Sequence, residues 1–161
     1  MNESISAAMY WLGVGAGATV LMDLWSLLLR RMGIPTLDYA MLGRWCGHWT
    51  QGRWFHQSIK DAAAVRGEKV CGWALHYFTG IAFAFALACW VGPHWIKAPT
   101  LTPALLMGIL SVALPWLILQ PALGAGVAAA KTPRPWMARA ASLTTHVVFG
   151  CGLFLSARAM A

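Results

Sequence analysis

The sequence predicts an all-α, polytopic membrane protein, a four-transmembrane-helix bundle forming one domain over residues 1–161. Of these residues 59% are hydrophobic and 11% are charged, and the mean hydropathy is +0.60. Too few polar side chains remain to cover the surface of a soluble domain. Four apolar segments are long enough to cross a hydrocarbon core of about 30 Å at about 1.5 Å per residue. Basic residues also gather in two of the loops, as membrane topology requires.

The first predicted span is Ile5–Leu29. We do not expect a cleaved signal peptide, because the segment lacks a basic n-region and is too long for an h-region. It also carries a carboxylate, Asp23, inside the apolar run TVLMDLWSLLLRR. We therefore expect this segment to stay in the protein as its first transmembrane helix.

The loop between the first and second spans is too long for a plain connector. A short helix starting at Pro35 and Thr36 is predicted to lie in the membrane interface, because Leu37, Met41 and Trp45 recur every four residues on one face.

Glycines then interrupt the stretch GRWCGHWTQGRWFH. Because glycine weakens helices, this stretch is predicted to be an irregular segment lying against the bundle. It carries His48 and His56.

The remaining predicted spans are Gly72–Val91, Leu101–Leu123 and Ala138–Ala157. In the third span, Pro115 and Pro121 each remove a backbone donor and bend the helix. Regular helix is expected to end at Pro121, close to the inner end of the span.

The basic residues predict the orientation. The first loop carries seven: Arg30, Arg31, Arg44, Arg53, Lys60, Arg66 and Lys69. The loop before the fourth span carries Lys131, Arg134 and Arg139, while the other side has only Lys97 and Arg158. By the positive-inside rule both basic loops lie in the cytoplasm and both termini outside it. The net charge of +7 then reflects topology and attraction to anionic lipid, and nucleic acid is not a predicted partner.

Four polar residues, one from each span, fall in one layer. Asp23, His76, Gln120 and His146 all lie about 6–12 Å from the predicted cytoplasmic boundary. An aspartate at the centre of a membrane helix costs about 2.5–3.5 kcal/mol and usually faces the bundle interior. An adjacent imidazole can keep the carboxylate charged, so Asp23 is predicted to point at His76, His146 or both.

Two kinds of cofactor fit this layer. Asp23, His76 and His146 form a ligand set suited to a divalent transition metal, zinc or iron, serving a reaction on a lipid-soluble substrate. The candidate supporting residues around such a metal are His48, His56, Tyr77 and Gln120. Alternatively, His76 and His146 are the axial ligands of a b-type haem, with room made by small residues at Gly80, Gly150 and Gly152.

Two further interpretations need no cofactor. The layer can serve a proton-coupled transporter of small solutes, or it can belong to a non-catalytic membrane partner in which it only latches the helices together. A path through four helices is narrow, so transport favours a homo-oligomer. The sequence leaves open whether the protein is an enzyme.

The motifs GRWCGH, GRWFHQSI, GEKVCGWALHY and QPALGAGVAAAKTPRP follow one another along nearly the whole chain. In this combination the sequence resembles a bacterial family of small integral membrane proteins described as a domain of unknown function. The resemblance implies a four-helix architecture in the bacterial inner (plasma) membrane, and it implies no mechanism. The residues it singles out coincide with the polar layer and the first loop: Asp23, His48, His56, His76, Gln120 and His146.

Overall fold

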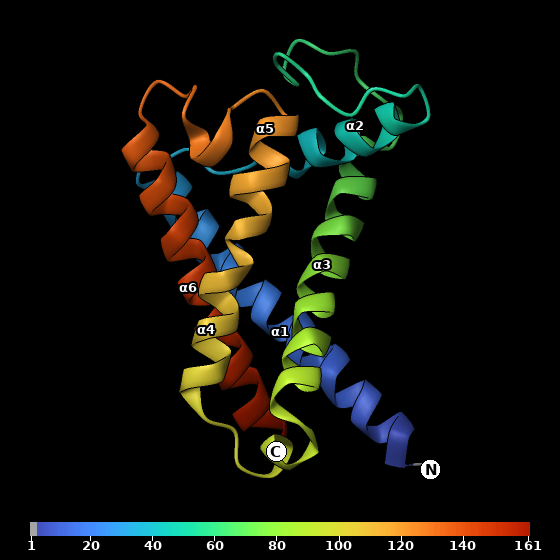
Figure 1. Cartoon of the computed structure of the whole chain (residues 1–161), viewed down its shortest axis with the longest axis vertical. Helices are drawn as coiled ribbons and strands as arrows, with labels where there is room; N and C mark the ends of the chain where they lie inside the picture. Colours follow the sequence, from blue (N-terminus) through green and yellow to red (C-terminus); the bar gives the residue numbers. More distant parts are fainter. Residues whose placement is uncertain (1–2) are drawn as a thin grey trace.

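The computed structural model describes residues 3–161, and these form helices without any strand. Four helical spans form a bundle: α1 (Glu3–Arg31), α3 (Glu68–Val91), the span of α4 (Leu101–Ser111), η2 (Pro115–Leu119) and α5 (Gln120–Ala122), and α6 (Pro135–Met160) (Figure 1). Each span is long and apolar enough to cross a membrane. The predicted fold class is confirmed.

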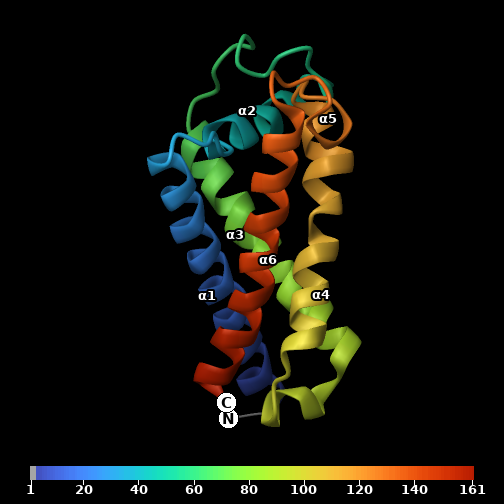
Figure 2. The same cartoon turned by 90° about the vertical axis from the view of Figure 1, so that its left-hand side faces the viewer.

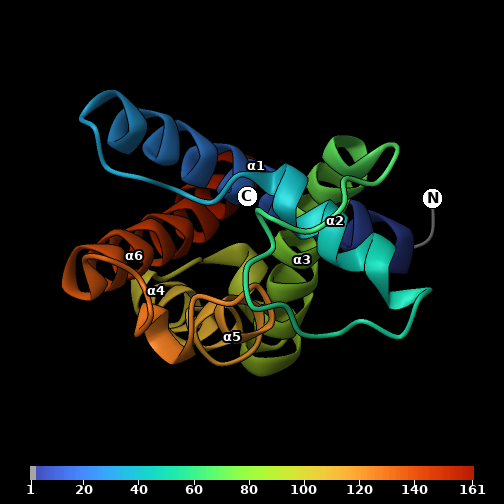
Figure 3. The same cartoon turned by 90° about the horizontal axis from the view of Figure 1, so that it is seen from above.

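Helix α2 (Tyr39–Trp49) lies across one end of the bundle (Figure 3). It begins later than predicted, because Asp38 is the N-cap and its carboxylate accepts a hydrogen bond from the backbone N–H of Ala40. It also continues through Gly43 and Gly47, so the prediction that these glycines begin an irregular segment is wrong.

The glycine at position 43 is explained by helix packing. A Cβ on Gly43 would collide with the backbone carbonyl of Glu68, and a Cβ on Gly72 would collide with that of Tyr39. Only glycine allows the backbones of α2 and α3 to approach this closely. A pair of small residues thus holds α2 on the start of α3.

Residues 50–67 form the irregular loop, which lies against the bundle as predicted. The N–H groups of His56 and Ile59 donate to the carbonyls of Ala122 and Leu123 at 2.8 and 3.1 Å. Arg44 binds the Glu68 carboxylate through Nε and Nη2 at 2.9 and 2.8 Å, and its Nη1 donates to the carbonyl oxygens of loop residues 59, 60 and 62. The ion pair raises the pKa of the Arg44 guanidinium above its ordinary value.

The prolines shape the third span. A π-helical segment begins at Pro115, and regular helix ends at Ala122, one residue after Pro121. Gly124 follows with φ +94°, and its missing side chain leaves room for the backbone of Gln57. The predicted end of the helix near Pro121 is confirmed.

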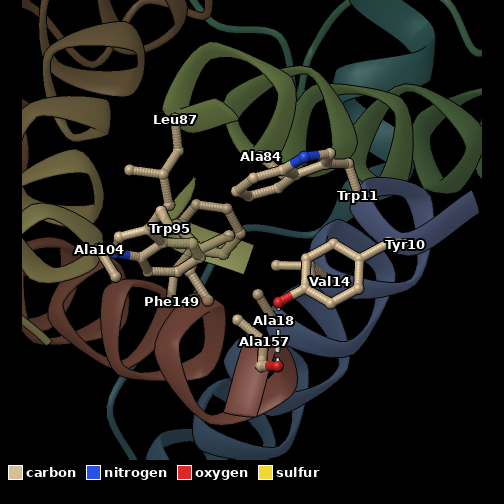
Figure 4. Close-up of a cluster of buried hydrophobic side chains, with 11 residues drawn as sticks. Tyr10, Trp11, Val14, Ala18, Ala84, Leu87, Trp95, Ala104, Phe149 and Ala157 are labelled. Carbon is tan, nitrogen blue, oxygen red and sulfur yellow. Dashed lines mark hydrogen bonds between the residues drawn. The ribbon is translucent and has the colours of Figure 1, made fainter. Parts of the chain in front are cut away.

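The buried core closes the end of the bundle opposite α2 (Figure 4). The rings of Trp11 and Trp95 stack with centroids 5.6 Å apart, and the Tyr10 hydroxyl donates to the carbonyl of Ala157 at 3.0 Å. Next to this core, Gly108 meets Gly150 between α4 and α6, and Gly152 meets Ala18 between α6 and α1. Helices α1 and α6 lie side by side (Figure 2), while α1 and α3 diverge toward the α2 end (Figure 1). The bundle is therefore closed at one end, while at the other end its residues line a cavity.

Candidate functional site

A cavity of about 480 Å³ occupies the hollow end of the bundle. All four spans contribute to its wall, and residues of α2 and the segment before it cover it: Pro35, Thr36, Leu37, Tyr39, Leu42, Trp45 and Trp49. Its other walls are mainly apolar side chains such as Met22, Phe83 and Phe149. Its size is that of a site for a drug-sized molecule.

His76 connects the cavity wall to Asp23. The Nε2 atom of His76 lies 3.0 Å from Oδ1 of Asp23, so the predicted contact between the first and second spans is present. The Tyr39 hydroxyl donates to the same oxygen at 3.0 Å, and its ring stacks on His76 with centroids 4.0 Å apart. The ring of Tyr77 packs edge-on against His76 at 5.6 Å. The imidazole is thereby fixed by α1, α2 and α3 together.

Tyr39 acts as a hydrogen-bond donor at all ordinary pH values. Burial raises the pKa of its hydroxyl far above the usual range, and the negative charge of Asp23 raises this pKa further. Because the hydroxyl keeps its proton, Oδ1 of Asp23 accepts from Tyr39 as well as from His76. The other carboxylate oxygen, Oδ2, is buried and has no hydrogen-bond partner in the described part of the chain.

His146 is held by a different partner. Its Nδ1 lies 2.7 Å from the hydroxyl oxygen of Ser111, which donates its own proton to the carbonyl of Gly108 at 2.6 Å. A serine hydroxyl has a single proton to give, so Nδ1 of His146 must be the donor to Ser111. The neutral ring then carries its lone pair on Nε2, which makes no hydrogen bond to residues 3–161.

The same reasoning assigns the tautomer of His76. A carboxylate only accepts hydrogen bonds, so Nε2 carries a proton and the lone pair of the neutral ring is on Nδ1. Nδ1 has no partner among the described residues either, and both histidines line the cavity. Each neutral ring therefore keeps one nitrogen that can accept a hydrogen bond and that has no partner within residues 3–161, and both rings line one cavity.

The structure does not assemble the predicted three-ligand metal centre. His146 binds Ser111 rather than Asp23. Within residues 3–161, no group of three or more His, Cys, Asp and Glu side chains is placed to hold a metal ion. Gln120 does line the cavity as part of the predicted layer, and its Oε1 is buried with no hydrogen-bond partner among the residues that the structure describes.

His48 and His56 form a pair in which the two rings contact each other. Nδ1 of His48 lies 2.8 Å from Nε2 of His56, and Nε2 of His48 lies 3.0 Å from the carbonyl of Ala63. His48 is buried in α2, where it fixes the loop rather than the cavity. Among the described residues neither ring hydrogen-bonds to Asp23, His76 or His146, and a supporting role at the Asp23 site stays a prediction.

The three glycines predicted to make room for a haem have other roles. A Cβ on Gly80 would meet the Thr19 hydroxyl, and Gly150 and Gly152 lie against the backbones of α4 and α1. All three positions are helix contacts, and Gly80 also lines the cavity, so the haem remains a prediction from the sequence.

One residue of the site has no counterpart in the sequence reasoning. Tyr39 lies at the first position of α2, directly after its N-cap. The pattern that could have located Tyr39 is Asp38, a typical N-cap residue, followed by residues that favour a helix. This pattern would place the Tyr39 hydroxyl at the start of a helix. Nothing in the spacing shows that this hydroxyl meets a carboxylate sixteen positions earlier.

The fold and the cavity define a class: an all-helical protein with four spans able to cross a membrane, hollow at one end and carrying two histidines on the cavity wall. The family model described as "Protein of unknown function (DUF2938)" matches residues 12–160. The chain belongs to this family. No curated protein and no solved structure matches it.

Proposed function

We propose that the protein binds a lipid-soluble small molecule carrying a hydrogen-bond donor in the cavity beneath α2. The observation that carries this proposal is the pair of free imidazole nitrogens, on His76 and His146, at one otherwise mainly apolar cavity. Such a cavity with a few polar groups is the usual form of a small-molecule site.

The apolar wall of the cavity favours a ligand that is soluble in lipid. Burying a polar molecule against Met22, Phe83 and Phe149 would cost free energy, whereas an apolar body gains about 25 cal/mol per Å² removed from water. The two acceptor nitrogens select what the ligand must carry, which is a hydroxyl or N–H group. A phenol with an apolar tail meets both requirements.

Asp23 and Tyr39 position the binding group. The carboxylate fixes His76 in one tautomer, and the stacked Tyr39 ring fixes the plane of the imidazole. Because Tyr39 belongs to α2, the cover of the cavity and its histidine are joined directly. Binding therefore depends on α2 remaining in place.

We expect a photoreactive alkylphenol carrying a diazirine to label the cavity. After labelling in lipid vesicles and digestion, mass spectrometry should place the label in residues 111–123 and 138–149. The matched probe with a methoxy group in place of the hydroxyl should label about five-fold less, since one hydrogen bond is worth about 1 kcal/mol. Replacing His76 and His146 together by leucine should remove this preference, because a phenol has one proton to donate and either nitrogen can accept it.

The control for this experiment is His94→Leu, which removes an imidazole in η1 (Pro93–Lys97), at the other end of the bundle. It should label like the unaltered protein. Equal labelling by the two probes would contradict the proposal. So would an equimolar zinc or iron ion that is lost on replacing either histidine, because the nitrogens would then be metal ligands.

We also propose that the α2 end faces the cytoplasm of a bacterium, with both termini outside. The support is the excess of arginine and lysine in the loops at that end. Alkaline phosphatase fused to the C-terminus is therefore expected to be active. Green fluorescent protein fused at the same position should not fluoresce, because the Sec pathway would export it unfolded. The reverse result would invert the topology.

A further inference from the structure

A second, smaller groove lies between α1 and α6. It has a volume of about 290 Å³. Its wall includes Leu24, Trp25 and Leu28 of α1 with Cys151 and Leu155 of α6, and none of these lines the central cavity. Leu24, Leu28 and Leu155 are about half exposed. The groove therefore opens outward from the bundle, toward lipid.

The positively charged residue Arg31 lies at the α2 end of α1, beyond the groove residues Leu24 and Leu28. Arg31 follows Leu24 by seven residues and Leu28 by three, so at helical spacing it continues the same face of α1. Its side chain is exposed, and no ion pair within residues 3–161 involves it. The charge is thus available to a partner outside the chain.

We propose that the α1–α6 groove binds an anionic phospholipid. The headgroup phosphate pairs with Arg31, and an acyl chain lies along Leu24, Leu28 and Leu155. Charge complementarity selects the anionic class, because a zwitterionic headgroup brings its own cation to the arginine. This site is independent of the ligand in the central cavity.

The test uses the full chain in vesicles that contain phosphatidylglycerol or phosphatidylcholine, each with a diazirine on one acyl chain. We expect phosphatidylglycerol to label residues 21–28 and 148–155 about five-fold more than phosphatidylcholine does. Arg31→Gln should abolish this difference.

Arg66→Gln is the matched control, because it removes the same charge from the exposed end of the first loop. It should leave the labelling unchanged. Equal labelling of the groove by the two lipids would overturn the proposal. An equal loss from Arg31→Gln and Arg66→Gln would overturn it too, because attraction would then depend on net charge and not on the site.

Discussion

Replacing Asp23 by leucine is expected to lower the free energy of unfolding by about 2–5 kcal/mol. The substitution removes one acceptor and leaves two donors, the Tyr39 hydroxyl and the His76 Nε2–H, without a partner. A buried donor left unsatisfied costs about 1–3 kcal/mol. Asp23→Asn should cost much less, about 1 kcal/mol, since its carbonyl oxygen can accept from both. Denaturant unfolding in a fixed detergent micelle measures these differences.

Two further variants separate this effect from a general loss of charge. Asp61→Leu removes a carboxylate from the exposed loop and should change stability by no more than about 0.5 kcal/mol. Replacing Asp23 and His76 together by leucine should be less costly than Asp23→Leu alone, because no unpaired imidazole donor remains. The double variant keeps the His146 acceptor, so it should still prefer the phenol probe. A fully stable Asp23→Leu protein would show that the carboxylate is not the shared acceptor.

Gly43→Ala is expected to destabilise the protein by about 2–3 kcal/mol and to displace α2. In an exposed helix the same change is favourable by up to about 1 kcal/mol, so the expected sign is opposite. The reason is the collision of the new Cβ with the backbone carbonyl of Glu68, which a rotamer change cannot relieve. Because Tyr39 moves with α2, phenol labelling of the cavity should fall in the same variant.

The matched variant is Gly13→Ala in the middle of α1. There the new Cβ would meet only the flexible end of the Met160 side chain, at 2.5 Å from its terminal carbon. This contact is relieved by a small rotation, so stability should be unchanged or slightly higher. If both variants are equally stable, α2 is not held on α3 by the glycine contact.

The interfacial helix shows where reasoning from the sequence fails. Helix propensity, which is a local property of the chain, predicts that Gly43 and Gly47 weaken a helix. Their actual role is set by α3 and the loop, since Glu68 and Val65 occupy the space that side chains would need. A close contact between distant segments overrides propensity, and a single sequence carries no sign of which glycines make such contacts.

The sequence predicts how deep in the membrane each site residue lies, but it does not predict which of them contact one another. Helical rise places Asp23, His76, Gln120 and His146 in one layer, but it does not give the rotation of each helix about its own axis. That rotation turns Asp23 toward His76 and leaves His146 to Ser111. The metal centre required all three to meet, and this depended on information that depth alone does not contain.

Hydropathy, length and the placement of prolines determined the fold class, the four spans and the end of the third span. These features depend on the transfer of side chains and unpaired backbone groups into an apolar medium, a cost that each segment carries locally. The cavity, the shared acceptor of Tyr39 and His76 and the pairing of His48 with His56 were decided only by the tertiary structure. They arise where helices packed through small residues at one end diverge at the other, and this geometry follows from contacts among segments far apart in the chain.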